Sequence, residues 1–201
     1  ELLDTLPERE LRAGFSEVIK YGLLGDAEFF HWCAENGAAL LAGDKDLRAT
    51  AVANCVRAKA GIVAADETER TGTRALLNLG HTFAHALEAA TGFSDRLLHG
   101  EAVALGMVLA AKYSARLDQL PLDAAQQIEE VIGLSGLPSS LSALHLKQSG
   151  AEIAALMLHD KKAGSGRVPL ILLGAIGEAF VYPESDLADV AAFLDGQLQA
   201  H

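Results

Sequence analysis

Cysteine is scarce in this chain of 201 residues, which contains only Cys33 and Cys55 and no CxxC pattern. Zinc sites built from thiolates need closely spaced cysteine pairs, and disulfide-rich secreted domains need more cysteines than two. The sequence therefore predicts two buried thiols in a reduced, cytoplasmic protein.

Positive charge is also in short supply, since 16 lysines and arginines stand against 27 aspartates and glutamates, for a net charge of −11. Such a chain is a poor partner for nucleic acid or an anionic bilayer surface. No apolar run reaches the roughly 18 residues that span a membrane, and no signal-peptide pattern is visible. We expect neither a nucleic-acid nor a membrane partner. An anionic ligand would require the few cationic side chains to gather at one place.

The glycine-rich signatures of nucleotide binding are missing. Neither GxxxxGK[ST] nor GxGxxG occurs, so the sequence predicts no dinucleotide-binding residues in this chain.

The chain begins with Glu1 instead of methionine and enters a helical pattern almost at once. We therefore expect it to be a piece of a longer protein.

Aromatic residues make up only 5% of the chain, and alanine and leucine carry most of its hydrophobic content, which favours helices. Apolar spacing predicts helices over 7–24, a short aromatic one from 26, and others over 44–66, 81–91, 99–117, 123–132, 149–159 and 186–198. Two strands, 168–173 and 179–182, are joined through Gly174 and Gly177 as a hairpin. The pattern predicts one mainly α-helical domain over 1–201, with a small β-hairpin near its C-terminus.

Three of the seven histidines fall within 19 residues. His81 and His85 are four residues apart and share one helix face, a common arrangement for holding Zn²⁺ when a third ligand lies elsewhere. His99 opens a helix that is apolar nearly all round, where a buried histidine is costly unless a metal or polar group satisfies it. Spacing alone favours His81 with His85 as ligands, and structural histidines at helix starts are the alternative.

Two pairs of charged residues also stand out in the sequence. Glu17 lies on the apolar side of the first helix, and Lys20 follows on the same face, a spacing typical of a surface ion pair. Lys161 and Lys162 precede the glycine-rich segment 164–166. Such a lysine pair can contact a phosphate, or it can be a solvated helix end.

Four segments of the chain, 6–22, 74–88, 98–107 and 160–162, together resemble the C-terminal domain of 3-dehydroquinate synthase. They occur in the family's order and spacing, and the resemblance covers essentially the whole chain. It implies a lyase of the shikimate pathway, which leads to chorismate and the aromatic amino acids. The reaction converts 3-deoxy-D-arabino-heptulosonate 7-phosphate to 3-dehydroquinate and phosphate, with Zn²⁺ or Co²⁺ and NAD⁺ as cofactors.

The resemblance also assigns roles to individual residues. It implies that the metal ligands are Glu17, His81 and His99, which replaces the His81–His85 pair suggested by spacing. The implied substrate contacts are Lys20, Lys59, Arg74, Asn78, His85, Lys161 and Lys162. Lys20, Glu69 and His85 are the implied catalytic groups. The segment from Asp66 to Arg74 is one residue longer than the family pattern. The assignment of Glu69 as a catalytic group depends on how this segment is matched.

The resemblance further implies that an N-terminal NAD⁺-binding domain is absent from this chain, that the fragment alone is inactive, and that the complete protein is a homodimer. Three other functions remain open on the sequence. They are another sugar phosphate cyclase, a metal-dependent polyol dehydrogenase, and a helical metal-binding module without catalysis.

Overall fold

A computed structural model describes residues 2–67, 72–158 and 167–200. Eight α-helices occur in these ranges: α1 (Glu8–Gly25), α2 (Ala27–Leu41), α3 (Lys45–Ala65), α4 (His81–Ala90), α5 (His99–Arg116), α6 (Leu122–Leu134), α7 (Gly150–Leu156) and α8 (Leu187–Gln199). Three short 3-10 helices, η1 (Leu2–Thr5), η2 (Arg74–Asn78) and η3 (Ser142–Leu144), and strands β1 (Arg167–Ala175) and β2 (Glu178–Asp186) complete the fold.

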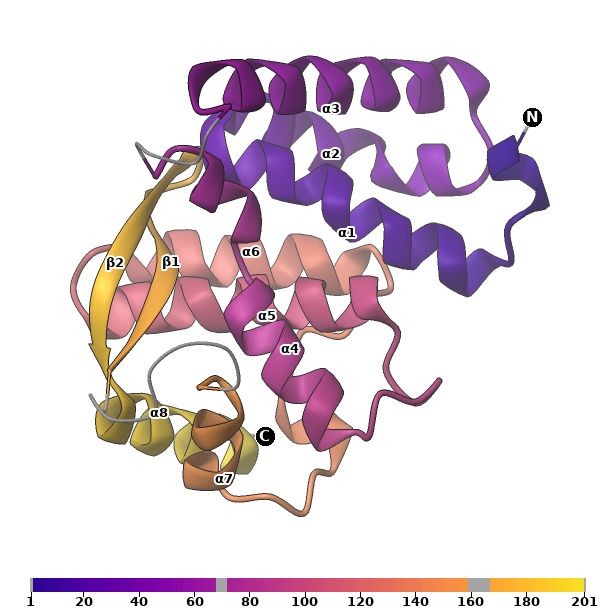
Figure 1. The fold of residues 1–201 in the computed structure, drawn as a ribbon. Coiled ribbons are helices and arrows are strands. Elements are labelled where there is room, and N and C mark those ends of the chain that lie inside the picture. The colour runs from indigo at the N-terminus through magenta and orange to yellow at the C-terminus, as the bar shows by residue number, and fades with distance from the viewer. Residues whose placement is uncertain (1, 68–71, 159–166, 201) are drawn as a thin grey trace.

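The helices are arranged around α5. Helices α1, α2 and α3 form a layer at one end of the molecule, while α7 and α8 lie at the other end (Figure 1). Helix α5 runs between them and contacts α1, α4, α6 and β1. Its sequence is apolar nearly all round, and 13 of its residues are buried, as expected of a central helix.

Two glycines of α5 bring its neighbours unusually close. A Cβ atom at Gly100 would lie 2.1 Å from the carbonyl oxygen of Ala13 in α1. A Cβ atom at Gly106 would lie 2.2 Å from the carbonyl oxygen of Gly80, immediately before α4. The absence of side chains at these two positions therefore sets the spacing of α1 and α4 against α5.

The hairpin packs against α5 through β1, and β2 contacts α1. Its antiparallel strands pair Leu170 with Tyr182 and Leu172 with Phe180. The hydroxyl of Ser114 in α5 accepts a hydrogen bond from the backbone N–H of Leu173 at 3.0 Å. The predicted fold class, a mainly α-helical domain with a small hairpin near the C-terminus, is confirmed.

Two predicted helices have the wrong length. The aromatic helix does not stop after Trp32 but continues to Leu41, because its buried face repeats at Phe29, Cys33, Gly37 and Leu40. Asp26 caps its start by accepting from the N–H of Phe29. The helix predicted over 149–159 ends at Leu156.

The two cysteines differ in exposure. Cys33 is buried, as predicted, whereas Cys55 is only half-buried on α3. Burial raises the pKa of Cys33 to about 12 and that of Cys55 to about 11, so both thiols stay protonated near neutral pH. Among the described helices, none is long and apolar enough to cross a membrane.

Candidate metal centre

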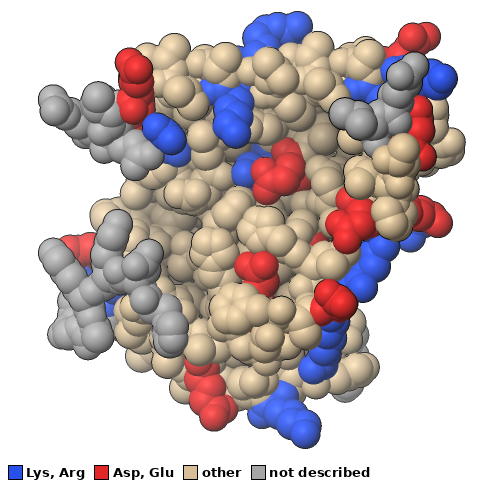
Figure 2. All heavy atoms as spheres, turned by 45° about the vertical axis from the view of Figure 1, so that its right-hand side comes forward, with Lys and Arg blue, Asp and Glu red and all other residues tan. Residues whose placement is uncertain are grey.

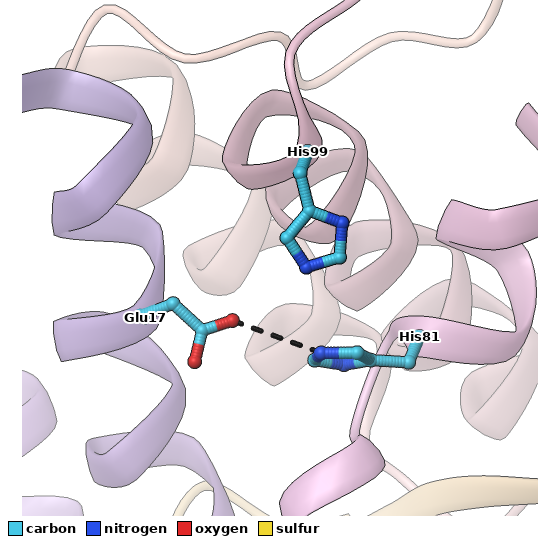
Figure 3. Close-up of side chains that lie close together, drawn as sticks. All are labelled: Glu17, His81 and His99. Atoms are coloured by element: carbon cyan, nitrogen blue, oxygen red, sulfur yellow. Dashed lines mark ion pairs between the residues drawn. The ribbon is translucent and has the colours of Figure 1, made fainter. Parts of the chain in front are cut away.

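Three side chains from three different helices meet at one point. Glu17 comes from the middle of α1, and His81 and His99 are the first residues of α4 and α5. One ligand atom from each lies within 4.8 Å of the others. Glu17 Oε1 is 3.8 Å from His81 Nε2, and the two imidazole rings are 5.5 Å apart between centroids. Figure 3 shows the three side chains pointing into the same space.

The donor set fits a divalent metal. Two imidazoles and a carboxylate are common ligands of catalytic zinc, with bonds of about 2.0–2.2 Å. Around a tetrahedral ion, ligand atoms bonded at that length lie about 3.3–3.5 Å apart. The 3.8 Å between Glu17 Oε1 and His81 Nε2 is only slightly wider, so a small side-chain rotation would close it.

Hydrogen bonds orient both imidazoles. Nδ1 of His81 is 3.1 Å from the carbonyl oxygen of Leu79, and Nδ1 of His99 is 3.1 Å from Glu88 Oε1. In each ring, the carbonyl or carboxylate oxygen is an acceptor, so Nδ1 is the nitrogen that carries the proton. In a neutral ring with this arrangement, Nε2 keeps the lone pair that a metal would bind.

A buried lysine sets the electrostatics of the centre. Lys20 is only 4% exposed, and its ammonium lies 2.6 Å from Glu17 Oε2, which leaves Oε1 facing His81. Burial lowers the pKa of His81, and the charge of Lys20 lowers it further. A lowered pKa favours the neutral imidazole that binds metals. The pair Glu17–Lys20 forms as the spacing suggests, but Lys20 is not at the surface.

The starts of α1 and α5 are tied by a charged network. Arg9 donates to both carboxylate oxygens of Glu101, each at 2.7 Å, and to the carbonyl oxygen of Asp95 at 2.8 Å. Glu101 also accepts from the backbone N–H of Leu98 at 2.9 Å, so it caps the helix that begins at His99. The network links the helix of Glu17 to the helix of His99.

Three of the expected substrate contacts line one cavity. Lys59, Arg74 and Asn78 border a space of about 600 Å³ between α3, η2 and the hairpin, together with Thr82, the residue after His81. Figure 2 shows one face of the molecule hollowed near its middle, with acidic and basic side chains interspersed around it. Two cationic groups therefore share one cavity, which Asp66 also borders, in a chain with a net charge of −11.

His85 lies beside the centre and is exposed. Its ring is 5.8 Å from that of His81 and 6.2 Å from that of His99, between centroids. With Glu88 and His99 it forms a second group of potential ligands whose ligand atoms lie within 4.8 Å of one another. His85 does not belong to the group that contains Glu17.

Three other expected site residues, Glu69, Lys161 and Lys162, lie outside the described residues. One prediction about the histidines is wrong: His99 is not buried, since its side chain is 53% exposed. Glu88, which lies beside His99, was not expected at the site. Its spacing of three residues from His85 on one helix face was an available signal.

The fold and this geometry define a class: a helical domain with a potential metal centre of two histidines and one carboxylate. The sequence profile of the family described as 3-dehydroquinate synthase C-terminal matches residues 14–163. The chain belongs to this family.

Curated relatives agree with the profile. The chain is 52% identical over 198 residues to a 3-dehydroquinate synthase from Zymomonas mobilis, covering 98% of this chain and 52% of the relative. It is also 52% identical over 202 residues to one from a Bradyrhizobium species, with the same coverage. The chain spans about half the length of these relatives.

Solved structures share the fold. A 2-epi-5-epi-valiolone synthase from Streptomyces hygroscopicus, with NAD⁺ and Zn²⁺ bound, superposes with a TM-score of 0.81 at 26% identity, over 96% of this chain and 52% of its own. A 2-deoxy-scyllo-inosose synthase complexed with carbaglucose-6-phosphate, NAD⁺ and Co²⁺ gives a TM-score of 0.76 at 24% identity, over 94% of this chain and 53% of its own. At that identity, the second structure supports the fold alone.

Proposed function

We propose that this chain is the metal- and substrate-binding part of a 3-dehydroquinate synthase, which converts 3-deoxy-D-arabino-heptulosonate 7-phosphate to 3-dehydroquinate and phosphate. The observation that carries the proposal is the meeting of Glu17, His81 and His99 in a member of this family. Residues 1–201 then form one domain, and NAD⁺ binding belongs to the half of the relatives that the chain does not match. The complete protein would be a cytoplasmic homodimer.

Glu17, His81 and His99 would hold Zn²⁺ or Co²⁺. When bound there, such an ion lowers the pKa of a coordinated substrate hydroxyl and so prepares it for oxidation by NAD⁺. Lys20 neutralises the Glu17 oxygen that faces away from His81, which keeps the other oxygen oriented toward the centre. One oxygen of the Glu17 carboxylate would thus bind the metal while the other contacts Lys20.

The cavity bordered by Lys59, Arg74 and Asn78 suits a doubly anionic substrate. An arginine can bind a carboxylate or phosphate through two parallel hydrogen bonds, and a lysine adds a compact charge. His85, exposed beside the centre, would exchange a proton with a substrate group bound there. Lys161, Lys162 and Glu69 are retained as expected pocket residues.

Phosphate release tests the proposed reaction. The complete protein that carries this chain should release phosphate from the heptulosonate phosphate but not from glucose 6-phosphate or sedoheptulose 7-phosphate. Activity on either of the latter two, with none on the first, would assign it to another sugar phosphate cyclase. Metal-dependent oxidation of a polyol without phosphate release would assign it to the dehydrogenases.

The cavity has its own test. Lys59→Met should raise the KM for the heptulosonate phosphate roughly ten-fold or more, because a charged hydrogen bond contributes about 1.5–3 kcal/mol. Lys147→Met, at an exposed lysine outside the cavity, is the matched control and should leave KM unchanged. Equal KM values for both variants would remove Lys59 from the substrate site.

A further inference from the structure

We propose that Glu88 is a positioning residue that holds the ring of His99 ready for the metal. This inference rests on the proposed function, because it assumes that His99 is a metal ligand. Glu88 itself lies in the second group of potential ligands, with His85 and His99. It therefore takes no place in the centre formed with Glu17.

The contact between Glu88 and His99 restrains the His99 ring. Glu88 lies in the last turn of α4 and His99 begins α5, and the carboxylate Oε1 is 3.1 Å from Nδ1 of His99. Within the described part of the chain, the His99 side chain has no other hydrogen-bond partner. Its side chain is 53% exposed, whereas that of Glu88 is only 15% exposed. A largely enclosed carboxylate thus restrains a ring that solvent would otherwise leave free to rotate.

The contact also suits metal binding through Nε2 of His99. A neutral imidazole that donates its Nδ1 proton to a carboxylate keeps the lone pair on Nε2, and the nearby negative charge makes Nε2 a stronger ligand. Figure 3 shows the other ring nitrogen of His99 facing the space shared with Glu17 and His81. His81 obtains the same orientation from the backbone oxygen of Leu79, which no substitution at residue 79 removes. Glu88 is therefore the side chain through which this orientation can be tested.

The same geometry argues against a second metal at His85, Glu88 and His99. Nδ1 of His99 cannot donate a proton to Glu88 and bind an ion at the same time. An ion in the second group would need this proton to be lost and a single imidazole to bridge two metals. The proposal therefore predicts one metal for each chain.

Metal binding by the complete protein tests the proposal, with zinc affinity measured by competition against a chromophoric chelator. Glu88→Ala should bind zinc 10–100-fold more weakly, as is typical when a carboxylate behind a histidine ligand is removed. Glu88→Gln keeps an acceptor oxygen but loses the charge, and it should lose about ten-fold. Glu35→Ala, at an exposed glutamate of α2, is the matched control and should bind zinc like the unsubstituted protein.

The visible spectrum of bound Co²⁺ gives a readout that a general loss of stability would not move. Glu88→Ala should alter the band positions, since the His99 ring is free to change its angle to the metal, while Glu35→Ala should not. Unchanged affinity and spectrum in Glu88→Ala would overturn the proposal. If Glu88→Ala does not fold, unchanged zinc affinity in Glu88→Gln would overturn it instead.

Stoichiometry separates the remaining outcomes. Two zinc ions per chain, one of which is lost in Glu88→Ala while the other keeps its affinity, would make Glu88 a ligand of a second site and overturn the positioning role. An unsubstituted protein that binds no zinc would defeat the proposed function itself. Tight binding that depends on His99 but not on Glu88 would defeat only this inference.

Discussion

At the scale of single residues, the two oxygens of Glu17 have different partners. Oε2 contacts the buried ammonium of Lys20 at 2.6 Å, and Oε1 faces His81 at 3.8 Å. A buried lysine requires a counter-charge, so the ion pair keeps the carboxylate in place whether or not a metal is present. The site is thus largely preorganised, which reduces the reorganisation that metal binding would require.

Removal of single histidines should distinguish the two possible ligand sets. His81→Ala and His99→Ala should abolish zinc binding measured by calorimetry, because each removes one of the three proposed ligands. His85→Ala should largely spare it, because His85 lies outside the group that contains Glu17. Equal losses in all three variants would instead support the pair His81 and His85.

At the scale of elements, the centre depends on how α1 and α4 lie against α5. Each helix carries one of the three proposed ligands, so a shift of any helix axis would separate their ligand atoms. Two kinds of contact hold the axes: the close approaches at Gly100 and Gly106, and the network of Arg9 with Glu101. Both can be tested without touching a ligand.

Gly100→Ala should destabilise the protein by roughly 1–3 kcal/mol, because the new methyl group would overlap the Ala13 carbonyl and push α1 away from α5. Zinc affinity should fall as well, because α1 carries Glu17. Gly61→Ala in α3 is the matched control: nothing lies within 4 Å of a Cβ there, and alanine is the better helix former. Urea denaturation should show Gly61→Ala more stable by about 0.5–1 kcal/mol. A stable Gly100→Ala would show that the helices adjust easily.

Arg9→Ala should lower stability by about 1–2 kcal/mol, because it removes two charged hydrogen bonds to the mostly buried Glu101. Arg12→Ala is the control on the same helix. Its partner Glu8 is 74% exposed, so the loss should be only about 0.3–0.5 kcal/mol. The melting temperatures of the two variants compare the contributions of the two arginines to stability. Equal decreases in melting temperature would mean that Arg9 does not hold α1 against α5.

At the scale of the whole molecule, α8 is fastened to the central helix by a second polar group. Asp189 accepts from Tyr113 at 3.0 Å and from Arg116 at 2.6 Å, both in α5. The hydrogen bond with Arg116 lowers the pKa of Asp189 below its ordinary value of 3.8, and the bond with Tyr113 adds to this. The stability of the C-terminal helix is thereby linked to pH.

Because the folded-state pKa of Asp189 is depressed, its contribution is fully present above the ordinary pKa and is lost as pH falls through the lower, folded-state value. Asp189→Asn should therefore be less stable than the unsubstituted protein at pH 7, and the gap should shrink below about pH 4. Melting temperatures measured from pH 7 to pH 3 give this difference. A gap that stays constant over that range would show that Asp189 does not titrate with folding.

The helical fold and the positions of His81 and His99 at helix starts could be predicted from the sequence. Both depend on residues that are close together in the chain. The spacing of apolar residues indicates which face of a helix is buried, and local residue types mark where a helix begins. The four conspicuous segments also carried the family resemblance, which the sequence profile and relatives confirmed. The length of α2 was misjudged because its apolar stripe is diluted by alanine and glycine after Trp32.

Local sequence patterns do not show which side chains meet, because that depends on how the helices pack. Glu17 is 64 positions from His81 in the chain, and their approach depends on α1 and α4 packing against the same helix. The burial of Lys20, the half-exposure of His99 and the contact of Glu88 with His99 follow from that packing as well. Residue spacing describes only one helix face at a time. A site formed by three helices depends on the distances between the helix axes. Here those distances depend on glycines at which the backbones touch.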